Sequence, residues 1–303
     1  MDGVSFRLDH GKVLGIVGES GSGKSVTAYS VMQILAPTGK IVSGSVKFDG
    51  QELVGADEKL LRSVRGNRIS IIFQDPMTSL NPTYTIGRQL MEAILLHTDR
   101  NRHQARERAV EMLKLVNVNE PEKRMKQYPF ELSGGMRQRM MIAMALACEP
   151  DILIADEPTT ALDVTIQAQI MRLLKQLQEK MGTSIILITH DLGIVAQIAK
   201  HVMVMYCGQA VEYSDVRSIY KNPLHPYTAG LLRSIPKLTD DDMEELPSIP
   251  GMVPSPSEKL QGCRFAPRCE KCGARCKKEM PDLVTLEDGR KVRCFLYEGG
   301  VEG

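Results

Sequence analysis

The stretch that decides the fold is VLGIVGESGSGKS at residues 13–25, where a short apolar run leads directly into a glycine-rich segment. The run at 13–17 predicts a buried strand, and the residues after it fit the P-loop pattern G-x-x-x-x-G-K-S. Glycines let the backbone turn tightly, so that successive N–H groups face phosphate oxygens. A helix beginning near Lys24 adds its positive N-terminal end. The predicted phosphate-binding residues are Gly18, Glu19, Ser20, Gly21, Ser22, Gly23, Lys24 and Ser25.

A second apolar run, at residues 152–155, supplies candidate catalytic carboxylates because it ends in Asp156 and Glu157. Carboxylates at the C-terminal edge of a parallel strand can face the same crevice as a P-loop. Lys24 is expected to reach the β- and γ-phosphates, while Ser25 supplies a hydroxyl to Mg²⁺. Asp156 is expected to hold the ion through water, and Glu157 to polarise the attacking water. Together these residues predict a nucleotide hydrolase or kinase.

Residues 1–215 alternate between apolar strands and helical segments, which predicts an α/β fold with a parallel sheet. Further strands are expected at 69–73, 184–189 and 202–206. A helical insertion is expected at about 76–148, because several of its apolar residues fall at helical spacing. These residues are Ala105, Ala109, Met112, Leu113 and Val116. Residues 216–303 form a second region, in which an acidic run at 240–245 and four prolines from Pro247 to Pro256 predict an extended surface linker.

The composition is that of an ordinary globular chain, with 43% hydrophobic and 25% charged residues among 303. The formal net charge of +1 gives no general attraction to nucleic acid or to an acidic membrane, so no nucleic-acid partner is expected. The longest apolar run, at residues 140–148, is too short to span a bilayer, and the N-terminus has no secretory pattern. We therefore expect the chain in the cytoplasm.

The segment LSGGMRQR at residues 132–139 decides the family. Ser133 can cap the helix that follows, and Gly134 and Gly135 allow an anion to approach the backbone closely. This segment closely resembles the signature motif of the ATP-binding-cassette (ABC) ATPases. Further elements agree with that family in order and spacing, namely Gln74, Pro158, Ala161-Leu162-Asp163 and His190. The resemblance covers nearly the whole chain and implies a RecA-like P-loop core with an inserted helical subdomain and a small Cys-rich C-terminal extension.

The resemblance also implies a role for each motif. In this family two cassettes pair head to tail, and each ATP lies between one P-loop and the signature of the partner. Gln74 would contribute to Mg²⁺ binding and sense the γ-phosphate. Ser133 and Gly135 would donate to the γ-phosphate held by the partner, and Asp163 would link the two sites. The implied catalytic set is Glu157, His190, which contacts the γ-phosphate, and Gln74.

Two further segments resemble the oligopeptide/dipeptide (peptide/nickel) importer subfamily, FQDPMTSLNP at 73–82 and NPLHPYT at 222–228. Residues 26–28 and 41–44 resemble its D-type subunit more than its F-type partner. The resemblance implies an ATPase at the cytoplasmic face of the membrane, paired with an F-type subunit or a second copy, beneath two permease subunits supplied by an extracytoplasmic binding protein. Peptide is the expected cargo, and nickel or another small solute is the alternative. A soluble, non-transport ABC ATPase and a metal-sensing regulatory module are the other readings.

Five of the seven cysteines lie between residues 263 and 294, and in a reducing compartment such a cluster favours a metal or cofactor site. Cys263, Cys269, Cys276 and Cys294 resemble the C-terminal extension of the importer subfamily, where this pattern is associated with a [4Fe–4S] cluster. Four thiolates suit Zn²⁺ equally well, Cys272 can replace one of the four, and reduced cysteines without metal are the further alternative. Six basic residues are expected to favour thiolate over thiol: Arg264, Arg268, Lys271, Arg275, Lys277 and Lys278.

The front of the sequence departs from the family pattern. The family has a strand and an adenine-stacking aromatic residue upstream of the segment at residues 4–6, whereas this sequence begins at Met1. Phe6 is expected in the strand that follows. We expect a start further upstream, a shortened chain or another contact to adenine, and a missing edge strand would weaken the small antiparallel sheet.

Overall fold

The computed structural model describes residues 1–160, 162–235, 248–254 and 261–298. Its contacts divide the chain into two compact units that interleave in sequence. The first unit comprises Met1–Arg7, Val13–Thr27 and Thr189–Gly303, and the second comprises Leu8–Lys12 and Ala28–Ile188. The division at residue 215 into a cassette and an extension follows chain order instead, and it stays a prediction.

The first unit is built on five strands. In spatial order these are β1 (Val13–Val17), β7 (His201–Tyr206), β8 (Gln209–Asp215), β10 (Lys291–Val292) and β9 (Val284–Thr285). The pair β1–β7 is parallel, and the remaining pairs are antiparallel. All five residues of β1 are buried, as expected for a strand covered on both faces. The strand therefore delivers the glycine-rich segment from a rigid core.

The helices of the first unit begin at side chains that cap them. They are α9 (Leu192–Ile198), α10 (Val216–Lys221) and α11 (Pro226–Arg233), and their respective caps are Asp191, Asp215 and His225. A cap side chain satisfies a backbone N–H that has no partner within the helix. The cysteine-rich residues after 261 carry three short 3₁₀ turns, at Ala266–Arg268, Arg275–Lys277 and Phe295–Tyr297, together with β9 and β10, and both views show this segment next to β8.

The second unit contains the parallel strands β4 (Ile69–Ile72), β5 (Ile152–Asp156) and β6 (Ser184–Thr189) in that order. The helix α8 (Val164–Met181) runs between the last two strands in sequence and buries one apolar face. A separate two-stranded sheet joins β2 (Lys47–Phe48) to β3 (Gln51–Glu52), and α2 (Glu58–Val64) follows it. The helix α1 (Lys24–Met32) begins at the glycine-rich loop.

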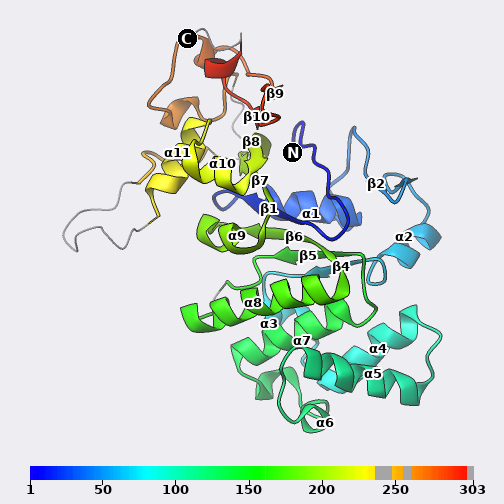
Figure 1. The fold of residues 1–303 in the computed structure, drawn as a ribbon. Helices are drawn as coiled ribbons and strands as arrows, with labels where there is room; N and C mark the ends of the chain where they lie inside the picture. The colour runs from blue at the N-terminus through cyan, green and yellow to red at the C-terminus, as the bar shows by residue number, and fades with distance from the viewer. Residues whose placement is uncertain (161, 236–247, 255–260, 299–303) are drawn as a thin grey trace. The chain divides into compact units, whose positions relative to one another are not determined.

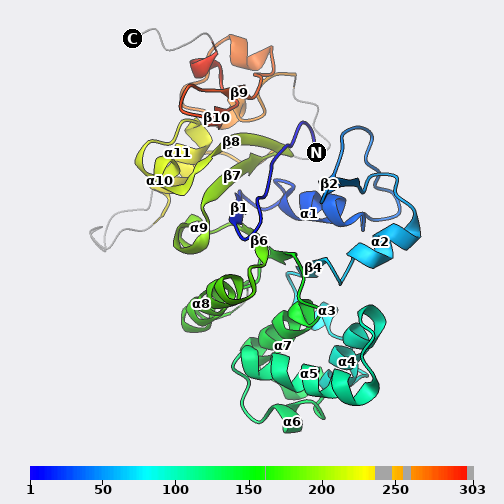
Figure 2. The same cartoon turned by 45° about the vertical axis from the view of Figure 1, so that its right-hand side comes forward.

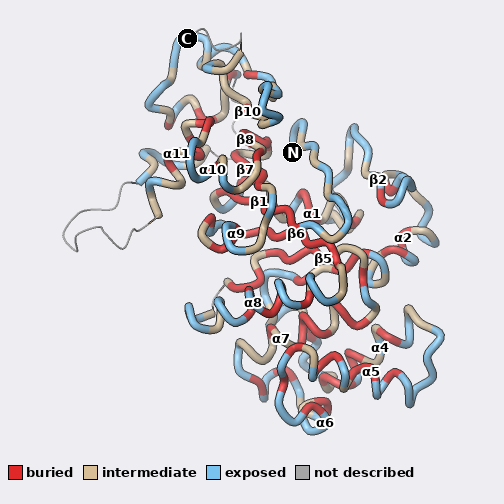
Figure 3. The backbone as a smooth tube through the Cα atoms, viewed as in Figure 1, coloured by how far each residue is buried: buried red, intermediate tan, exposed pale blue. Residues whose placement is uncertain are grey.

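Between β4 and β5 the chain is helical, and Figure 2 shows these helices grouped together. They are α3 (Pro76–Ser79), α4 (Ile86–His97), α5 (Arg102–Leu115), α6 (Pro121–Arg124) and α7 (Gly134–Leu146), with a 3₁₀ turn at Pro129–Glu131. The apolar residues that predicted a buried face at 105–116 are no more than 2% exposed. Figure 3 shows this face and the core strands as the buried parts of the chain.

Two sequence predictions need correction. The five expected strands are present to within one residue at either end, but β8, β9 and β10 were not expected, and they make the sheet mixed instead of parallel. Residues 4–6 form no strand, because none of the described strands pairs with them; β2, which follows later in the chain, pairs with β3. The acidic run at 240–245, Pro247 and Pro256 lie outside the described residues, as does Ala161. Among the described helices, none combines the length and apolar character needed to cross a membrane.

Candidate functional site

The glycine-rich loop at residues 18–25 wraps around its own lysine. Lys24 is 5% exposed, and its Nζ donates hydrogen bonds to the carbonyl oxygens of Gly18 (2.8 Å) and Glu19 (3.0 Å). Gly18 has φ +154°, and a Cβ at this position would lie 2.2 Å from the carbonyl oxygen of Met205 on β7. Only glycine fits there. The loop thus holds a buried ammonium at the start of a helix, as a phosphate site requires.

Two residues far along the chain also contact this loop, and sequence reasoning did not identify either. The hydroxyl of Tyr227 accepts a hydrogen bond from the backbone N–H of Glu19 (2.9 Å). The guanidinium of Arg268 donates two hydrogen bonds to the Glu19 carboxylate, at 2.7 and 3.1 Å. The Arg268 side chain is 4% exposed and that of Glu19 is 28% exposed. This is the planar, two-point pairing that arginine makes with carboxylates.

The predicted acid pair ends β5. Asp156 is fully buried, and it lies beside the hydroxyl of Tyr29, whose pKa is raised by burial and further by the Asp156 charge. Glu157 has φ +46°, a left-handed conformation that costs a non-glycine residue about 1–3 kcal/mol and is concentrated at functional sites. The amide of Gln74 and the hydroxyl of Thr160 donate to the same Glu157 oxygen, at 3.1 and 2.8 Å. The structure thus brings Gln74 to the predicted catalytic carboxylate.

The remaining motif residues lie at the beginnings of helices. Ser133 caps α7 by accepting from the N–H of Met136 (3.4 Å), and Asp163 caps α8 by accepting from the N–H of Ile166 (2.9 Å). Gly135 faces α8 closely, because a Cβ there would lie 3.0 Å from Ile166 Cγ2. Ser133 and Asp163 are exposed, as a contact with a second chain would require. Their roles toward a partner stay predictions.

The predicted ATP-site residues are divided between the two units. The first unit holds the loop at 18–25 together with His190, which is exposed after β6. The second unit holds Gln74, Ser133, Gly135, Asp156, Glu157 and Asp163. The donors proposed for Mg²⁺ are the hydroxyl of Ser25, the amide oxygen of Gln74 and the carboxylate of Asp156. All three are hard oxygen ligands, which fit this ion.

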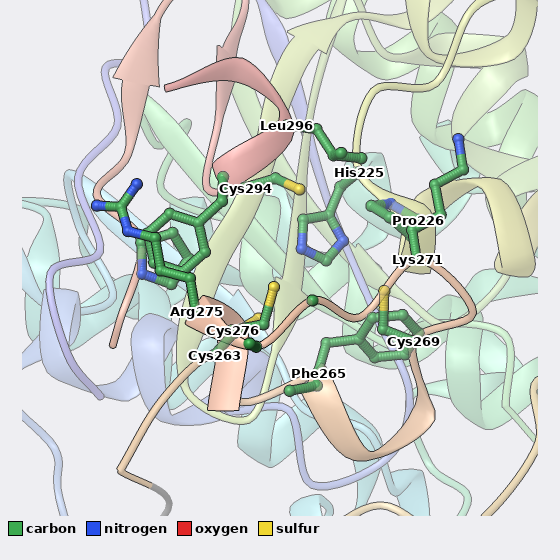
Figure 4. A pocket seen from close by; sticks show the side chains of 15 residues that line it. His225, Pro226, Cys263, Phe265, Cys269, Lys271, Arg275, Cys276, Cys294 and Leu296 are labelled. Atoms are coloured by element: carbon green, nitrogen blue, oxygen red, sulfur yellow. The ribbon is translucent and has the colours of Figure 1, made fainter. Parts of the chain in front are cut away.

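The four predicted cysteine ligands share one cavity of about 210 Å³ in the first unit. Figure 4 shows Cys269, Cys276 and Cys294 around this hollow with His225 and Phe265, and Cys263 completes the set of lining thiols. Cys272, by contrast, is not among the lining residues. Among the described residues no three His, Cys, Asp or Glu side chains lie close enough to hold one metal ion, so the ligand role of the four lining cysteines stays a prediction.

The expectation that basic neighbours favour thiolates at these cysteines is wrong. Burial raises the pKa of Cys263 and Cys269, and it raises that of Cys294 to about 11. The reason lies in where the guanidinium groups point. Arg268 pairs with Glu19, and Arg275 pairs with Glu279 (2.8 Å) and Glu298 (3.0 Å). These two guanidinium groups pair with carboxylates, so burial is the larger influence and raises the pKa of Cys263, Cys269 and Cys294.

With this geometry in view, comparison with known proteins gives a consistent result. Residues 1–160 match the ABC transporter family, and residues 211–276 match the oligopeptide/dipeptide transporter C-terminal region. The chain is 52% identical over 299 residues to the oligopeptide transport ATP-binding protein AppD of Bacillus subtilis (strain 168), covering 98% of this chain and 91% of that protein. It belongs to the ABC transporter ATP-binding family.

Further relatives of this ABC chain agree. It is 49% identical over 294 residues to the dipeptide transport ATP-binding protein DppD of Escherichia coli (strain K12), covering 97% of this chain and 90% of that protein. Among solved structures, it is similar to the ATP-binding cassette MJ0796, described as a dimer in a post-hydrolysis state bound to ADP and Pi. That likeness has a TM-score of 0.63 at 29% identity and covers 70% of this chain and 88% of the other.

Proposed function

We propose that this chain is the ATP-hydrolysing subunit that powers import of dipeptides or oligopeptides through an ABC transporter. The observation that carries the proposal is identity of about half of all residues, over nearly the full chain, to proteins named for oligopeptide and dipeptide transport. The match to the oligopeptide/dipeptide C-terminal region supports the same cargo class. Nickel or another small solute is the alternative cargo.

Different residues serve nucleotide binding and hydrolysis in this proposal. The loop at 18–25 binds the ATP phosphates, with Lys24 released from its carbonyl partners to the β- and γ-phosphates. Ser25, Gln74 and Asp156 would hold Mg²⁺, which would supply positive charge beside the phosphate oxygens. Glu157 accepts hydrogen bonds from two neutral donors, which orient its carboxylate to polarise a water. His190 contacts the γ-phosphate, and Gln74 senses whether that phosphate is present.

We further propose that two cassettes pair head to tail at the cytoplasmic face of the membrane, with an F-type subunit or a second copy as the partner. The exposed signature supports this arrangement, as does Val164, which is 81% exposed beside Asp163. MJ0796, a similar cassette, is described as dimeric. In the pair, Ser133 and Gly135 of one chain reach the γ-phosphate on the other. Two permease subunits and an extracytoplasmic binding protein complete the transporter.

The test is transport in proteoliposomes that contain this chain with its neighbouring permease, binding-protein and second ATPase components. A labelled dipeptide should accumulate only with ATP, and Lys24→Ala should abolish both nucleotide binding and uptake. Uptake of nickel without uptake of peptide would show that nickel is the cargo. Hydrolysis stimulated by nucleic acid instead of by permeases would show that the chain is not a transport ATPase. Co-purification of the permeases with this chain is the matching biochemical expectation.

We also propose that the cysteine cavity holds a [4Fe–4S] cluster in preference to Zn²⁺. Within the described residues, no three His, Cys, Asp or Glu side chains lie close enough to hold one metal ion. A tetrahedral zinc site with Zn–S bonds of about 2.3 Å needs its sulfurs within about 4 Å of one another. A cubane cluster binds one cysteine at each iron, so its ligands lie farther apart. Four thiols spread around a cavity of about 210 Å³ suit the larger group.

Metal analysis and an absorption spectrum of anaerobically purified protein test this proposal. About four iron and four acid-labile sulfide per chain, with a broad band in the visible, are expected for one cluster. Cys276→Ser should remove the signal, whereas Cys272→Ser, the matched control outside the cavity, should keep it. Stoichiometric zinc in a colourless protein, or a folded protein free of metal, would overturn the assignment.

A further inference from the structure

Two arginines of the cysteine-rich segment each stand next to a cavity cysteine. Arg264 directly follows Cys263, and Arg268 directly precedes Cys269. Neither side chain lines the cavity: Arg264 donates to the carbonyl oxygen of Cys207, and Arg268 donates to Glu19 in the glycine-rich loop. The short turn Ala266–Arg268 lies between them, so the backbone that presents the two thiols also presents the two guanidinium groups.

The first connection is the pair between Arg268 and Glu19. Besides its two bonds to the Glu19 carboxylate, the guanidinium donates to the backbone oxygens of Pro250 (2.9 Å) and Ile249 (3.4 Å). Every nitrogen of this nearly inaccessible group therefore has an acceptor, and the charge is fixed in place. Glu19 is the second residue of the loop, and its carbonyl oxygen accepts a hydrogen bond from Lys24, so this one residue joins Arg268 to Lys24.

The second connection runs through the turn between β7 and β8. Arg264 donates to the carbonyl oxygen of Cys207 in this turn, and also to Asp2 (3.0 Å). The next residue, Gly208, donates its N–H to the carbonyl oxygen of Ser22 in the glycine-rich loop (2.8 Å). The loop is thus reached from the cysteine-rich segment at two points, Glu19 and Ser22.

The segment between the two arginines is packed firmly. The Phe265 ring lies against Tyr206 and Tyr227, with ring centroids 5.2 and 5.4 Å apart, and against His225 at 5.7 Å. Phe265 is 4% exposed, and Tyr227 in turn receives the N–H of Glu19. Aromatic packing of this kind transmits a displacement of the cavity wall to its neighbours, because close-packed interiors do not absorb it.

We propose that Arg268 is a positioning residue for the nucleotide, which acts through Glu19 and makes the four-cysteine cavity a structural part of the ATP site. The inference rests on the proposed function, since it assumes that the loop at 18–25 binds ATP. With the cavity intact, Arg268 holds Glu19 and the loop keeps the shape that receives phosphates. Rearrangement of the cavity thiols displaces Arg268, loosens the loop and weakens nucleotide binding.

The test compares two identical substitutions in the full chain. Arg268→Gln should raise the Kd for a fluorescent ATP analogue (trinitrophenyl-ATP with Mg²⁺) about tenfold. Arg275→Gln is the matched control. Arg275 also stands beside a cavity cysteine, Cys276, but among the described residues its ion pairs are with Glu279 and Glu298 and not with the glycine-rich loop. Arg275→Gln should leave the Kd unchanged. Arg268→Lys keeps the charge without the planar fork and should give an intermediate value.

A second arm separates positioning from loss of fold. Cys269→Ser should raise the Kd in the wild-type background and add little in the Arg268→Gln background, because both act on one contact. The visible spectrum of Arg268→Gln should stay close to that of Arg275→Gln, and Arg268→Gln, although less stable, should still unfold in one cooperative transition above the assay temperature. If Arg268→Gln does not fold, Glu19→Gln breaks the same pair from the loop side and should give the same rise in Kd.

An unchanged Kd in a folded Arg268→Gln or Glu19→Gln protein would overturn the inference, and so would an equal rise in Arg275→Gln. Additive effects of Cys269→Ser and Arg268→Gln would show that the cavity and the loop are independent, which also overturns it. Lys24→Ala distinguishes these results from failure of the proposed function. If that variant binds the analogue as the wild type does, the ATP site itself is misassigned.

Discussion

Two glutamates of the nucleotide machinery are held in opposite ways. Glu19, in the glycine-rich loop, meets a buried guanidinium through two charge-assisted hydrogen bonds. Glu157, after β5, receives one amide and one hydroxyl, and its backbone has φ +46°. One carboxylate is fixed by charge, and the other is oriented by neutral donors on a strained backbone.

The difference bears on which carboxylate takes part in hydrolysis and which one holds the loop. Charge-assisted, two-point pairs are roughly twice as strong as neutral hydrogen bonds, so Glu19 cannot leave Arg268 at low cost. The donors of Glu157 orient it without neutralising it, and neutral donors exchange readily for water or substrate. We therefore expect Glu19 to hold the loop and Glu157 to take part in hydrolysis, and the predictions below test that separation from the largest effect to the smallest.

Glu157→Gln should have the largest effect. The amide cannot polarise the attacking water, so steady-state hydrolysis should fall by about 10²–10⁴-fold, while the ATP Kd stays within about threefold of the wild-type value. Hydrolysis and analogue binding are measured on the same preparation. The variant should also accumulate as a closed, ATP-bound pair by size-exclusion chromatography. Normal turnover would show that another residue is the base.

Glu19→Gln should destabilise the fold more than any exposed pair would. It leaves the Arg268 charge buried without its partner, which should lower the free energy of unfolding by about 3 kcal/mol. This is the lower end for a buried pair, because the Glu19 side chain is 28% exposed. Urea unfolding gives the value.

The control for that prediction is Glu270→Gln, which breaks an exposed pair with Arg233 (3.3 Å) in the same unit. It should cost less than about 1 kcal/mol. Replacing Arg268 by Met in the Glu19→Gln background should recover part of the loss, because the unpaired charge is then removed. Equal losses of unfolding free energy in Glu19→Gln and Glu270→Gln would mean that the buried Arg268–Glu19 pair stabilises the fold no more than an exposed pair does.

The parts of the molecule that could be predicted from sequence are those encoded locally. The strand before the P-loop, the loop itself and the acid pair after β5 are contiguous in sequence, so periodicity and motif spacing predict them. The helical face at 105–116 follows from the same reasoning. Gln74 was predicted through the family resemblance, and the structure joins it to Glu157 across 83 residues.

The contacts that sequence did not predict are long-range or rest on few residues. The Arg268–Glu19 pair spans 249 residues, and the basic character of the segment pointed instead to its nearby thiols. The strands β9 and β10 have two residues each, too few for any alternation to be seen. Glu212 is fully buried in β8, where it accepts from the N–H groups of Leu224 and His225. The spacing of apolar residues, which predicts buried strands, cannot reveal that a charged residue such as Glu212 is buried.

Acid should lower the free energy of unfolding through His225, whose neighbour Tyr227 contacts Glu19. This residue is buried, and its Nδ1 accepts from the N–H of Tyr227 (3.1 Å), which requires the neutral ring. Burial lowers its pKa from 6.5 to about 3. Below pH 6.5 the unfolded chain binds a proton that the folded chain does not, so stability falls as the pH falls toward 3. The slope should approach about 1.4 kcal/mol per pH unit.

The pH effect is isolated by the difference between the wild type and His225→Asn, whose shorter side chain can still cap α11. Burial raises the pKa of Glu212, which acts in the opposite direction, but both proteins retain that residue. Unfolding free energies are measured by urea at several pH values. A difference that stays constant between pH 6.5 and pH 4 would show that His225 titrates normally in the folded chain.

Gln74→Ala should have the smallest effect and is the sharpest test of how Glu157 is held. It removes one neutral hydrogen bond, worth about 1 kcal/mol, so hydrolysis should fall about fivefold while the unfolding free energy stays within about 0.5 kcal/mol. Thr160→Val removes the other donor and should behave alike. Larger losses require a second role for Gln74, such as the predicted contact with Mg²⁺, and raising the Mg²⁺ concentration should then restore part of the rate. If neither variant lowers the rate, Glu157 does not depend on these donors, and its strained backbone alone must orient it.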